Sequence, residues 1–151
     1  AKTNGNYVNS MMALKEALDH GFDEALMLDI DGYVSEGSGE NIFVIKDDVI
    51  YTPHLTSALP GITRDTIFTL AKSLGYDIIE KKISCEEIYL SDEAFFTGTA
   101  AEVTPIRDLD GNQIGEGSRG PVTKKLQTLY FDCVHGRNAD FSHWIDSGRC
   151  L

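Results

Sequence analysis

The segment Tyr33-Val34-Ser35-Glu36-Gly37-Ser38-Gly39-Glu40-Asn41-Ile42-Phe43 places two carboxylates among small residues, directly before a predicted strand. A second segment, Ala58-Leu59-Pro60-Gly61-Ile62-Thr63-Arg64-Asp65, is a Pro/Gly turn that opens into a predicted helix. Backbone N–H groups at the start of a helix commonly bind an anionic phosphate. Together the two segments predict a site for a phosphate-bearing cofactor.

The chain around these segments predicts one domain of the α+β class. Apolar residues at three-to-four spacing predict a helix over 7–20, and turn signals separate predicted strands at 24–30, 32–34, 41–46 and 49–52. Further along, the pattern predicts helices at 63–74, 84–90 and 122–134, and strands at 77–83, 94–97 and 103–109. Ser84 and Glu87 form a capping box. Because short turns join most of the strands, we expect a mostly antiparallel sheet with packed helices.

Composition limits the kinds of partner that the protein can have. The chain has 151 residues, of which 42% are hydrophobic, which is enough for one buried core. Its net charge of −11 would repel a nucleic-acid backbone, and no basic patch offsets it. No apolar run approaches the ~18 residues of a membrane span, and the N-terminus lacks a signal-peptide pattern. We therefore expect neither a nucleic acid nor a membrane as a partner.

The cysteines and the N-terminus give two further expectations. Cys85, Cys133 and Cys150 are widely spaced and odd in number, which predicts neither a disulfide framework nor a metal knuckle. A reducing, cytoplasmic environment fits this pattern. The chain starts at Ala1 without a Met and enters a helical pattern within a few residues. That start predicts a fragment of a longer protein.

Several motifs have a simpler structural explanation than a ligand site. Residues 115–120 match G-x-G-x-x-G, but no βαβ unit surrounds them, and Glu116 would repel a pyrophosphate. Asp29-Ile30-Asp31-Gly32 resembles part of a calcium loop, yet its Gly comes too early and a hairpin turn explains it. The four histidines have no ligand spacing. We therefore predict no metal site.

Four places keep both a structural and a functional interpretation. Glu36 and Glu40 flank a glycine-rich turn and are either a solvated acidic loop or carboxylates aimed at a ring nitrogen. The start of the helix at Ile62 and Thr63 is either a rigid turn with a cap or a phosphate site. Gly98-Thr99-Ala100-Ala101 is either a plain turn or an anion-binding loop. Composition alone makes Lys2 a solvated lysine.

With these residues in view, the sequence resembles the C-terminal half of the branched-chain amino acid aminotransferases, which are pyridoxal-phosphate enzymes of fold type IV. The resemblance runs from Lys2 to about Trp144. It rests on five motifs in order: Lys-x3-Asn-Tyr, Ser-Glu-Gly-x-Gly-Glu-Asn, Leu-Pro-Gly-Ile-Thr-Arg-Asp, Gly-Thr-Ala-Ala-Glu-Val-Thr-Pro and Gly-Pro-Val-Thr. It implies the C-terminal domain of a D-amino acid aminotransferase-like fold, an antiparallel pseudo-barrel with packed helices.

The resemblance implies a role for each candidate residue. Lys2 would bind pyridoxal 5'-phosphate covalently and carry the proton between the substrate and the cofactor, which requires a setting that lowers the pKa of a lysine. Tyr7 would approach the ring phenolate oxygen, and Glu36 would face the ring nitrogen and keep it protonated. Ile62, Thr63 and Thr99 would hold the phosphate, Thr99 and Ala100 would meet the substrate carboxylate, and Glu40 would support these contacts from behind.

The resemblance also implies partners and limits. The substrates would be a branched-chain L-amino acid and 2-oxoglutarate, and we expect a homo-oligomer. An N-terminal domain, absent here, would supply a phosphate-binding arginine and much of the substrate wall, so we expect little activity from these 151 residues alone. The alternatives are a D-amino acid transaminase or aminodeoxychorismate lyase on the same scaffold, or a non-catalytic domain.

Overall fold

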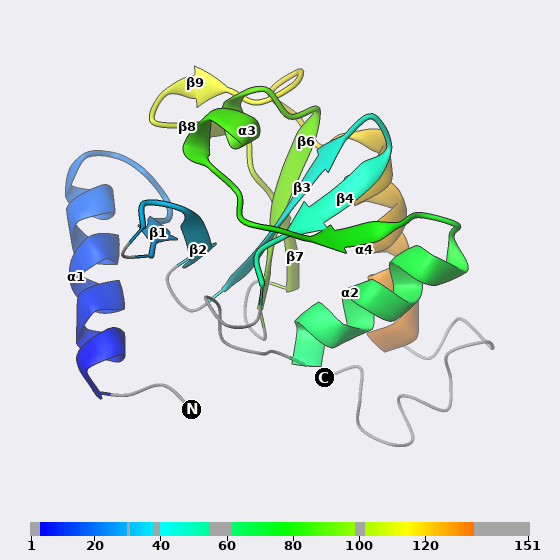
Figure 1. Cartoon of the computed structure of the whole chain (residues 1–151), viewed down its shortest axis with the longest axis horizontal. Coiled ribbons are helices and arrows are strands. Elements are labelled where there is room, and N and C mark those ends of the chain that lie inside the picture. The colour runs from blue at the N-terminus through cyan, green and yellow to red at the C-terminus, as the bar shows by residue number, and fades with distance from the viewer. Residues whose placement is uncertain (1–3, 30, 38–39, 55–61, 99–101, 135–151) are drawn as a thin grey trace.

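The computed structural model describes residues 4–29, 31–37, 40–54, 62–98 and 102–134 (Figure 1). Four helices and nine strands lie within these ranges. In chain order they are α1 (Asn4–Asp19), β1 (Leu26–Leu28), β2 (Val34–Gly37), β3 (Asn41–Lys46), β4 (Val49–Thr52), α2 (Ile62–Ser73), β5 (Ile78–Glu80), α3 (Cys85–Tyr89), β6 (Glu93–Gly98), β7 (Glu102–Pro105), β8 (Asp108–Leu109), β9 (Asn112–Gln113) and α4 (Pro121–Val134). The predicted α+β class is confirmed.

A five-stranded sheet with the order β5-β4-β3-β6-β7 forms the centre of the molecule. The pairs β3–β4, β3–β6 and β6–β7 are antiparallel, as predicted. The pair β4–β5 is parallel, with Ile50 opposite Ile78. Since α2 crosses from β4 to β5, the chain can enter the second strand in the same direction as the first. The prediction of a mostly antiparallel sheet is confirmed, and the pairing of the edge strand β5 with β4 is the exception.

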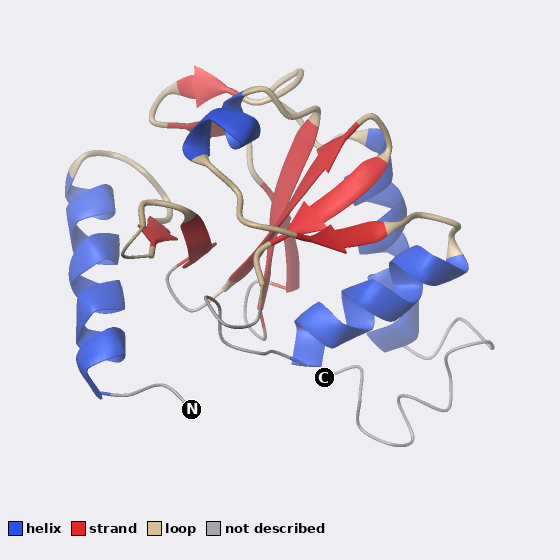
Figure 2. Ribbon diagram, in the orientation of Figure 1, coloured by secondary structure: helices blue, strands red, loops and turns tan. Residues whose placement is uncertain are grey.

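The two faces of the sheet carry separate hydrophobic clusters. Alternate side chains of a strand point to opposite faces, so Phe43 and Phe95 pack beneath α2 and α4, with their rings stacked at 5.1 Å. Ile42 and Phe96 point the other way and contact the cluster that includes Ile88 of α3. Figure 2 shows α2 and α4 together on one side of the sheet and α3 on the other. The central strands β3 and β6 are therefore buried on both faces.

The tight turns that join the strands follow from local chemistry. Asp47 and Asp48 between β3 and β4 both adopt positive φ values, of 50° and 63°. Asp110 and Gly111 do the same between β8 and β9, at 52° and 82°. Two consecutive residues with positive φ match the right-handed twist of a hairpin, and Asp and Gly tolerate this conformation. Both turns join antiparallel strands, β3 to β4 and β8 to β9.

The N-cap predicted at Ser84 at the start of α3 is also confirmed, and the Glu87 carboxylate pairs with Lys81 at 3.1 Å. The Ser84 hydroxyl accepts a hydrogen bond from the Glu87 backbone N–H at 3.3 Å. We expect Ser84→Ala to lower the free energy of unfolding by about 1 kcal/mol, because a helix N–H would lose its partner. Urea denaturation of the two proteins would measure this difference, and an unchanged midpoint would contradict it.

The last glycine of the G-x-G-x-x-G match, Gly120, packs against a buried carboxylate. Glu93, which is 7% exposed, accepts hydrogen bonds from the backbone N–H groups of Val122 and Thr123 at 3.2 and 2.8 Å. A Cβ atom at Gly120 would overlap the carboxyl carbon of Glu93. The start of α4, where a dinucleotide phosphate would bind, is thus already capped by a carboxylate of the same chain.

The cysteines differ from the expectation. Cys85 is free, whereas Cys133 near the end of α4 is disulfide-bonded. The cysteines therefore give no support for the predicted reducing, cytoplasmic environment. Within the described ranges, no helix combines the length and the apolar character that crossing a bilayer requires.

Candidate functional site

Strand ends from the first predicted motif and from β6 meet at one end of the sheet. β2 ends at Gly37, β3 begins at Asn41, and β6 ends at Gly98, with Asn41 paired to Thr97 across the ladder. The first turn of α2 lies at the same end of the molecule (Figure 1). The acidic segment and the helix start, which are far apart in the sequence, are therefore brought to a common edge.

Two buried polar side chains at this edge lack a partner. Asn41 is 8% exposed and Thr97 is fully buried. Neither the Asn41 Oδ1 nor the Thr97 Oγ1 has a hydrogen-bond partner in the part of the chain that the structure describes. Both side chains lie on the face covered by α2 and α4, because they stand two residues from Phe43 and Phe95 along their strands. Unpartnered buried polar atoms are rare in native proteins, so this edge can accept polar groups from elsewhere.

The start of α2 supplies the anion-binding geometry. α2 has 12 residues and begins at Ile62. Its first backbone N–H groups have no carbonyl partner within the helix, and the helix dipole makes this end electropositive. Thr63, in the first turn, is only 3% exposed. A phosphate placed at this helix end would receive backbone hydrogen bonds.

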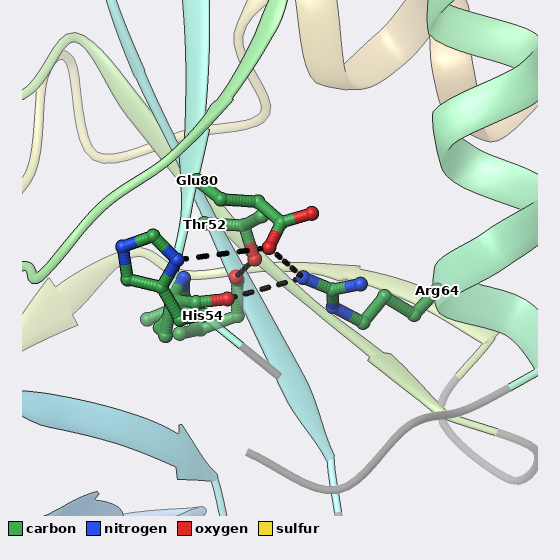
Figure 3. A network of polar contacts seen from close by, with 6 residues as sticks. Thr52, His54, Arg64 and Glu80 are labelled. Atoms are coloured by element: carbon green, nitrogen blue, oxygen red, sulfur yellow. Dashed lines mark hydrogen bonds and ion pairs between the residues drawn. The ribbon is translucent and has the colours of Figure 1, made fainter. Parts of the chain in front are cut away.

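A buried arginine fixes the first turn of α2 to the sheet (Figure 3). Arg64 is 2% exposed, and its Nη2 donates to the Pro53 carbonyl oxygen at 3.1 Å. The same nitrogen lies 4.0 Å from the Glu80 Oε2, which in turn lies 3.8 Å from the His54 Nδ1. The guanidinium also stacks on the Phe68 ring at 4.7 Å. These contacts link α2 to the end of β4 and to β5.

Electrostatics at Arg64 reflect this burial. Burial lowers the pKa of the guanidinium, and the charges of Glu80 and Asp65 oppose that shift. Arginine stays protonated despite such shifts, so the network holds a permanent positive charge inside the protein. The motif that contains Arg64 was predicted from the sequence, but no role was predicted for Arg64 itself. The spacing could have indicated its burial, because Arg64 lies three and seven residues before Ile67 and Ala71 and shares their buried face of the helix.

Glu40 is the second predicted residue whose side chain the structure describes. It is half-buried at the end of the loop between β2 and β3. Burial, a hydrogen bond with Glu24 and the charge of Glu24 raise its pKa to about 7. Glu24 was not predicted as its partner, because the two residues are far apart in the sequence and only the pairing of β1 with β2 brings their segments together.

The remaining predicted site residues are placed incompletely. Tyr7 lies in α1, Glu36 in β2 and Ile62 at the start of α2, but their side chains lie outside what the structure describes. Lys2, Thr99 and Ala100 lie outside the described residues altogether. The structure therefore brings the chain segments that carry Glu36, Glu40, Ile62 and Thr63 to one end of the molecule. The contributions of Lys2, Thr99 and Ala100 stay predictions.

A cavity on the other face of the sheet is a separate feature. A cavity of about 770 Å³ opens between the C-terminal half of α1 and the face of the sheet that carries α3. Its lining includes Glu24, Ile88, Phe96 and Arg107. Tyr7 lies near the opposite end of α1 from the lining residues Ala13 to His20. No group of three or more His, Cys, Asp or Glu side chains that could hold a metal occurs among the described residues.

Comparison with known proteins identifies the family of this chain. The family described as amino-transferase class IV matches residues 1–109. The chain therefore belongs to the class IV aminotransferase family. The predicted resemblance is confirmed at this level.

Individual relatives are similar over nearly the whole chain. The branched-chain-amino-acid aminotransferase of Pseudomonas aeruginosa is 62% identical over 144 residues, which are 95% of this chain and 47% of that protein. The enzyme of the same name from Escherichia coli K12 is 52% identical over 147 residues, 97% of this chain and 48% of that protein. The chain spans about half the length of the curated relatives it matches.

Solved structures have the same fold. A branched-chain amino acid aminotransferase complexed with N-(5'-phosphopyridoxyl)-L-glutamate aligns with a TM-score of 0.92 and 48% identity. The alignment covers 95% of this chain and 48% of that one. The Escherichia coli branched-chain amino acid aminotransferase aligns with a TM-score of 0.88 and 52% identity, over 91% of this chain and 47% of that one.

Proposed function

We propose that this chain is the C-terminal, cofactor-binding domain of a two-domain pyridoxal-phosphate-dependent aminotransferase that acts on branched-chain L-amino acids with 2-oxoglutarate. The observation that carries the proposal is the joining of the two motif segments at one edge of the sheet, in a chain that is 62% identical to a branched-chain-amino-acid aminotransferase. A solved enzyme of that name, 48% identical to this chain, is complexed with a phosphopyridoxyl derivative of glutamate.

The described residues fit such a cofactor. The start of α2 offers backbone N–H groups and a buried Thr63 to a phosphate, and Arg64 holds that turn in place. The unpartnered Asn41 Oδ1 and Thr97 Oγ1 lie at the same edge of the sheet and leave polar groups for a bound molecule or its loops. Glu36 lies near the end of β2, which leads into this edge.

Each site residue then has a defined task. Pyridoxal phosphate, when bound, supplies an electron sink for the α-carbon of the amino acid. The backbone of Ile62 and Thr63, with the Thr99 hydroxyl, binds the phosphate, and Tyr7 meets the ring oxygen. Glu36 keeps the ring nitrogen protonated. Lys2 attaches the cofactor and moves the proton from the α-carbon, while the Thr99 and Ala100 N–H groups orient the substrate carboxylate.

The second half of the active site belongs, in this proposal, to an N-terminal domain of the same polypeptide. The large apolar side chains of Met11, Met12 and Leu18 on α1 are 54%, 65% and 54% exposed. Contiguous exposed apolar surface is typical of a contact with another domain or subunit. We propose that α1 contributes to that contact and that the whole protein is a homo-oligomer with the D-amino acid aminotransferase-like fold.

Transamination by the full-length protein tests this function directly. We expect turnover of leucine, isoleucine and valine with 2-oxoglutarate at about 1–10³ per second, and little or none from the 151-residue chain alone. D-alanine and aminodeoxychorismate serve as competing substrates. Preference for either would replace the proposed substrate class, and failure to bind pyridoxal phosphate would favour a non-catalytic domain.

A further inference from the structure

Asn41 and Thr97, the two buried side chains with unpartnered polar atoms, form one pair across the central sheet. Asn41 is the first residue of β3, Thr97 stands next to the end of β6, and the two are directly opposite each other in the antiparallel ladder. Directly opposite residues have Cβ atoms about 4.5–5.5 Å apart and point to the same face. The Asn41 Oδ1 and the Thr97 Oγ1, which lack a hydrogen-bond partner among the described residues, therefore belong to one small polar cluster.

This pair lies beside the first turn of α2. The rings of Phe43 on β3 and Phe68 on α2 are in contact, with centroids 6.0 Å apart. Asn41 lies two residues before Phe43, about 6.6 Å along the strand. Thr63 and Arg64 lie five and four residues before Phe68, about 6–7.5 Å along the helix. Because β3 and α2 both begin at this end of the molecule (Figure 1), these equal steps bring the pair level with the start of the helix.

The donor and acceptor types of the pair favour a water molecule as the missing partner. The amide oxygen of an Asn only accepts hydrogen bonds, whereas the hydroxyl of a Thr both donates and accepts. The oxygens of an ionised phosphate accept, so they cannot satisfy the Asn41 Oδ1 directly. A water molecule can donate one proton to the Asn41 Oδ1, donate the other to a phosphate oxygen, and accept from the Thr97 hydroxyl. Buried water molecules typically make about three such hydrogen bonds.

We propose that Asn41 and Thr97 are positioning residues of the phosphate site, and that they hold one ordered water molecule beneath a phosphate at the start of α2. This role rests on the proposed function, in which the phosphate of the cofactor binds at this helix start. The helix dipole attracts an anion without fixing its orientation. The water adds a donor at a defined position. The two polar groups gain their partners when the phosphate binds, so the protein without cofactor is destabilised by them.

Thr97→Val in the full-length protein separates stability from affinity. Valine has the shape of threonine without the hydroxyl, so the variant should bind pyridoxal 5'-phosphate about tenfold more weakly. Pyridoxal, which lacks the phosphate, should bind the variant and the wild type equally. Without cofactor, the variant should melt about 2–4 °C higher, because a methyl group replaces an unsatisfied buried hydroxyl. Thr97→Ser keeps the hydroxyl and should bind pyridoxal 5'-phosphate as the wild type does.

Thr123→Val is the matched control. Thr123 is 1% exposed, and its Oγ1 also lacks a hydrogen-bond partner within the described ranges. Its backbone N–H donates to Glu93 at the start of β6, whereas Thr97 lies four residues later on that strand. This separation is about 13 Å along the strand. Thr123→Val should therefore raise the melting temperature in the same way and leave the affinity for pyridoxal 5'-phosphate unchanged.

Inorganic phosphate distinguishes failure of this role from failure of the proposed function. It should raise the melting temperature of the wild type more than that of Thr97→Val. If it does so in a protein that does not bind pyridoxal 5'-phosphate, the proposed function fails and the phosphate role of the pair stands.

Three results would overturn the role of the pair. The first is an equal affinity of Thr97→Val and the wild type for pyridoxal 5'-phosphate, or an equal loss for pyridoxal. The second is a lower melting temperature of cofactor-free Thr97→Val, which would show that the hydroxyl already has a partner. The third does not depend on any variant: a crystal structure of the cofactor-bound protein with no water within about 3.2 Å of both the Asn41 Oδ1 and the Thr97 Oγ1.

Discussion

Lys2→Ala should remove the visible absorbance of lysine-bound pyridoxal phosphate from the full-length protein and reduce its transamination rate. We expect a loss of at least about 10²–10⁴-fold, because this amine carries the proton between the substrate and the cofactor in the proposed function. Absorbance titration with pyridoxal phosphate and steady-state assays would measure both effects. Borohydride reduction followed by mass spectrometry should find the label on Lys2 in the unmodified sequence.

Lys15→Ala provides the matched control for this variant. Lys15 is an exposed lysine on α1 that pairs with Asp19 at 2.9 Å, one turn away. Such surface pairs contribute about 0.3–0.5 kcal/mol to stability, so neither the absorbance nor the rate should change. Retention of the absorbance in Lys2→Ala, or labelling at another lysine, would refute the assignment of Lys2.

Arg64→Met should destabilise the protein by about 2–4 kcal/mol and weaken cofactor binding, because the Pro53 carbonyl loses a charge-assisted hydrogen bond of about 1.5–3 kcal/mol. The stacking on Phe68 is lost as well. The first turn of α2, which carries Thr63, then loses its link to β4 and β5. Denaturant unfolding would measure the stability, and fluorescence titration would measure the affinity for pyridoxal phosphate.

Two further variants separate the effects of charge and geometry at Arg64. Arg64→Lys keeps the charge but lacks the planar donor fork, so we expect only partial recovery. His54→Ala removes a half-exposed ring at the outer edge of the network and should change stability by less than about 1 kcal/mol. Wild-type stability in Arg64→Met would show that the buried guanidinium does not secure the helix.

Local sequence signals predicted the elements that local chemistry determines. The apolar spacing of α2, the Asp-Asp and Asp-Gly turns and the Ser84 cap each depend on residues within a few positions of one another. The ends of the strands were predicted less accurately. The strand predicted over 24–30 covers only Leu26–Leu28, and the strand predicted over 77–83 covers only Ile78–Glu80. Edge strands this short are set by their neighbours more than by their own residues.

The contacts that build the site were not predictable in the same way. Arg64 meets Glu80, and Glu24 meets Glu40, across 16 positions of sequence in each case, because strand register and a helix crossover bring them together. Composition alone made Lys2 a solvated lysine. The roles of Lys2, Tyr7 and Glu36 came from resemblance to a family, whereas the involvement of Arg64 and Glu24 came from three-dimensional packing.

The close approach of Glu93 to Gly120 makes the cap of α4 depend on the absence of a side chain at position 120. The carboxylate that caps α4 occupies the space that any side chain at position 120 would need. The two positions are 27 residues apart in the sequence, yet the space at one is filled by the side chain of the other. A methyl group at position 120 would push the Glu93 side chain away and leave the backbone N–H groups of Val122 and Thr123 without their acceptor.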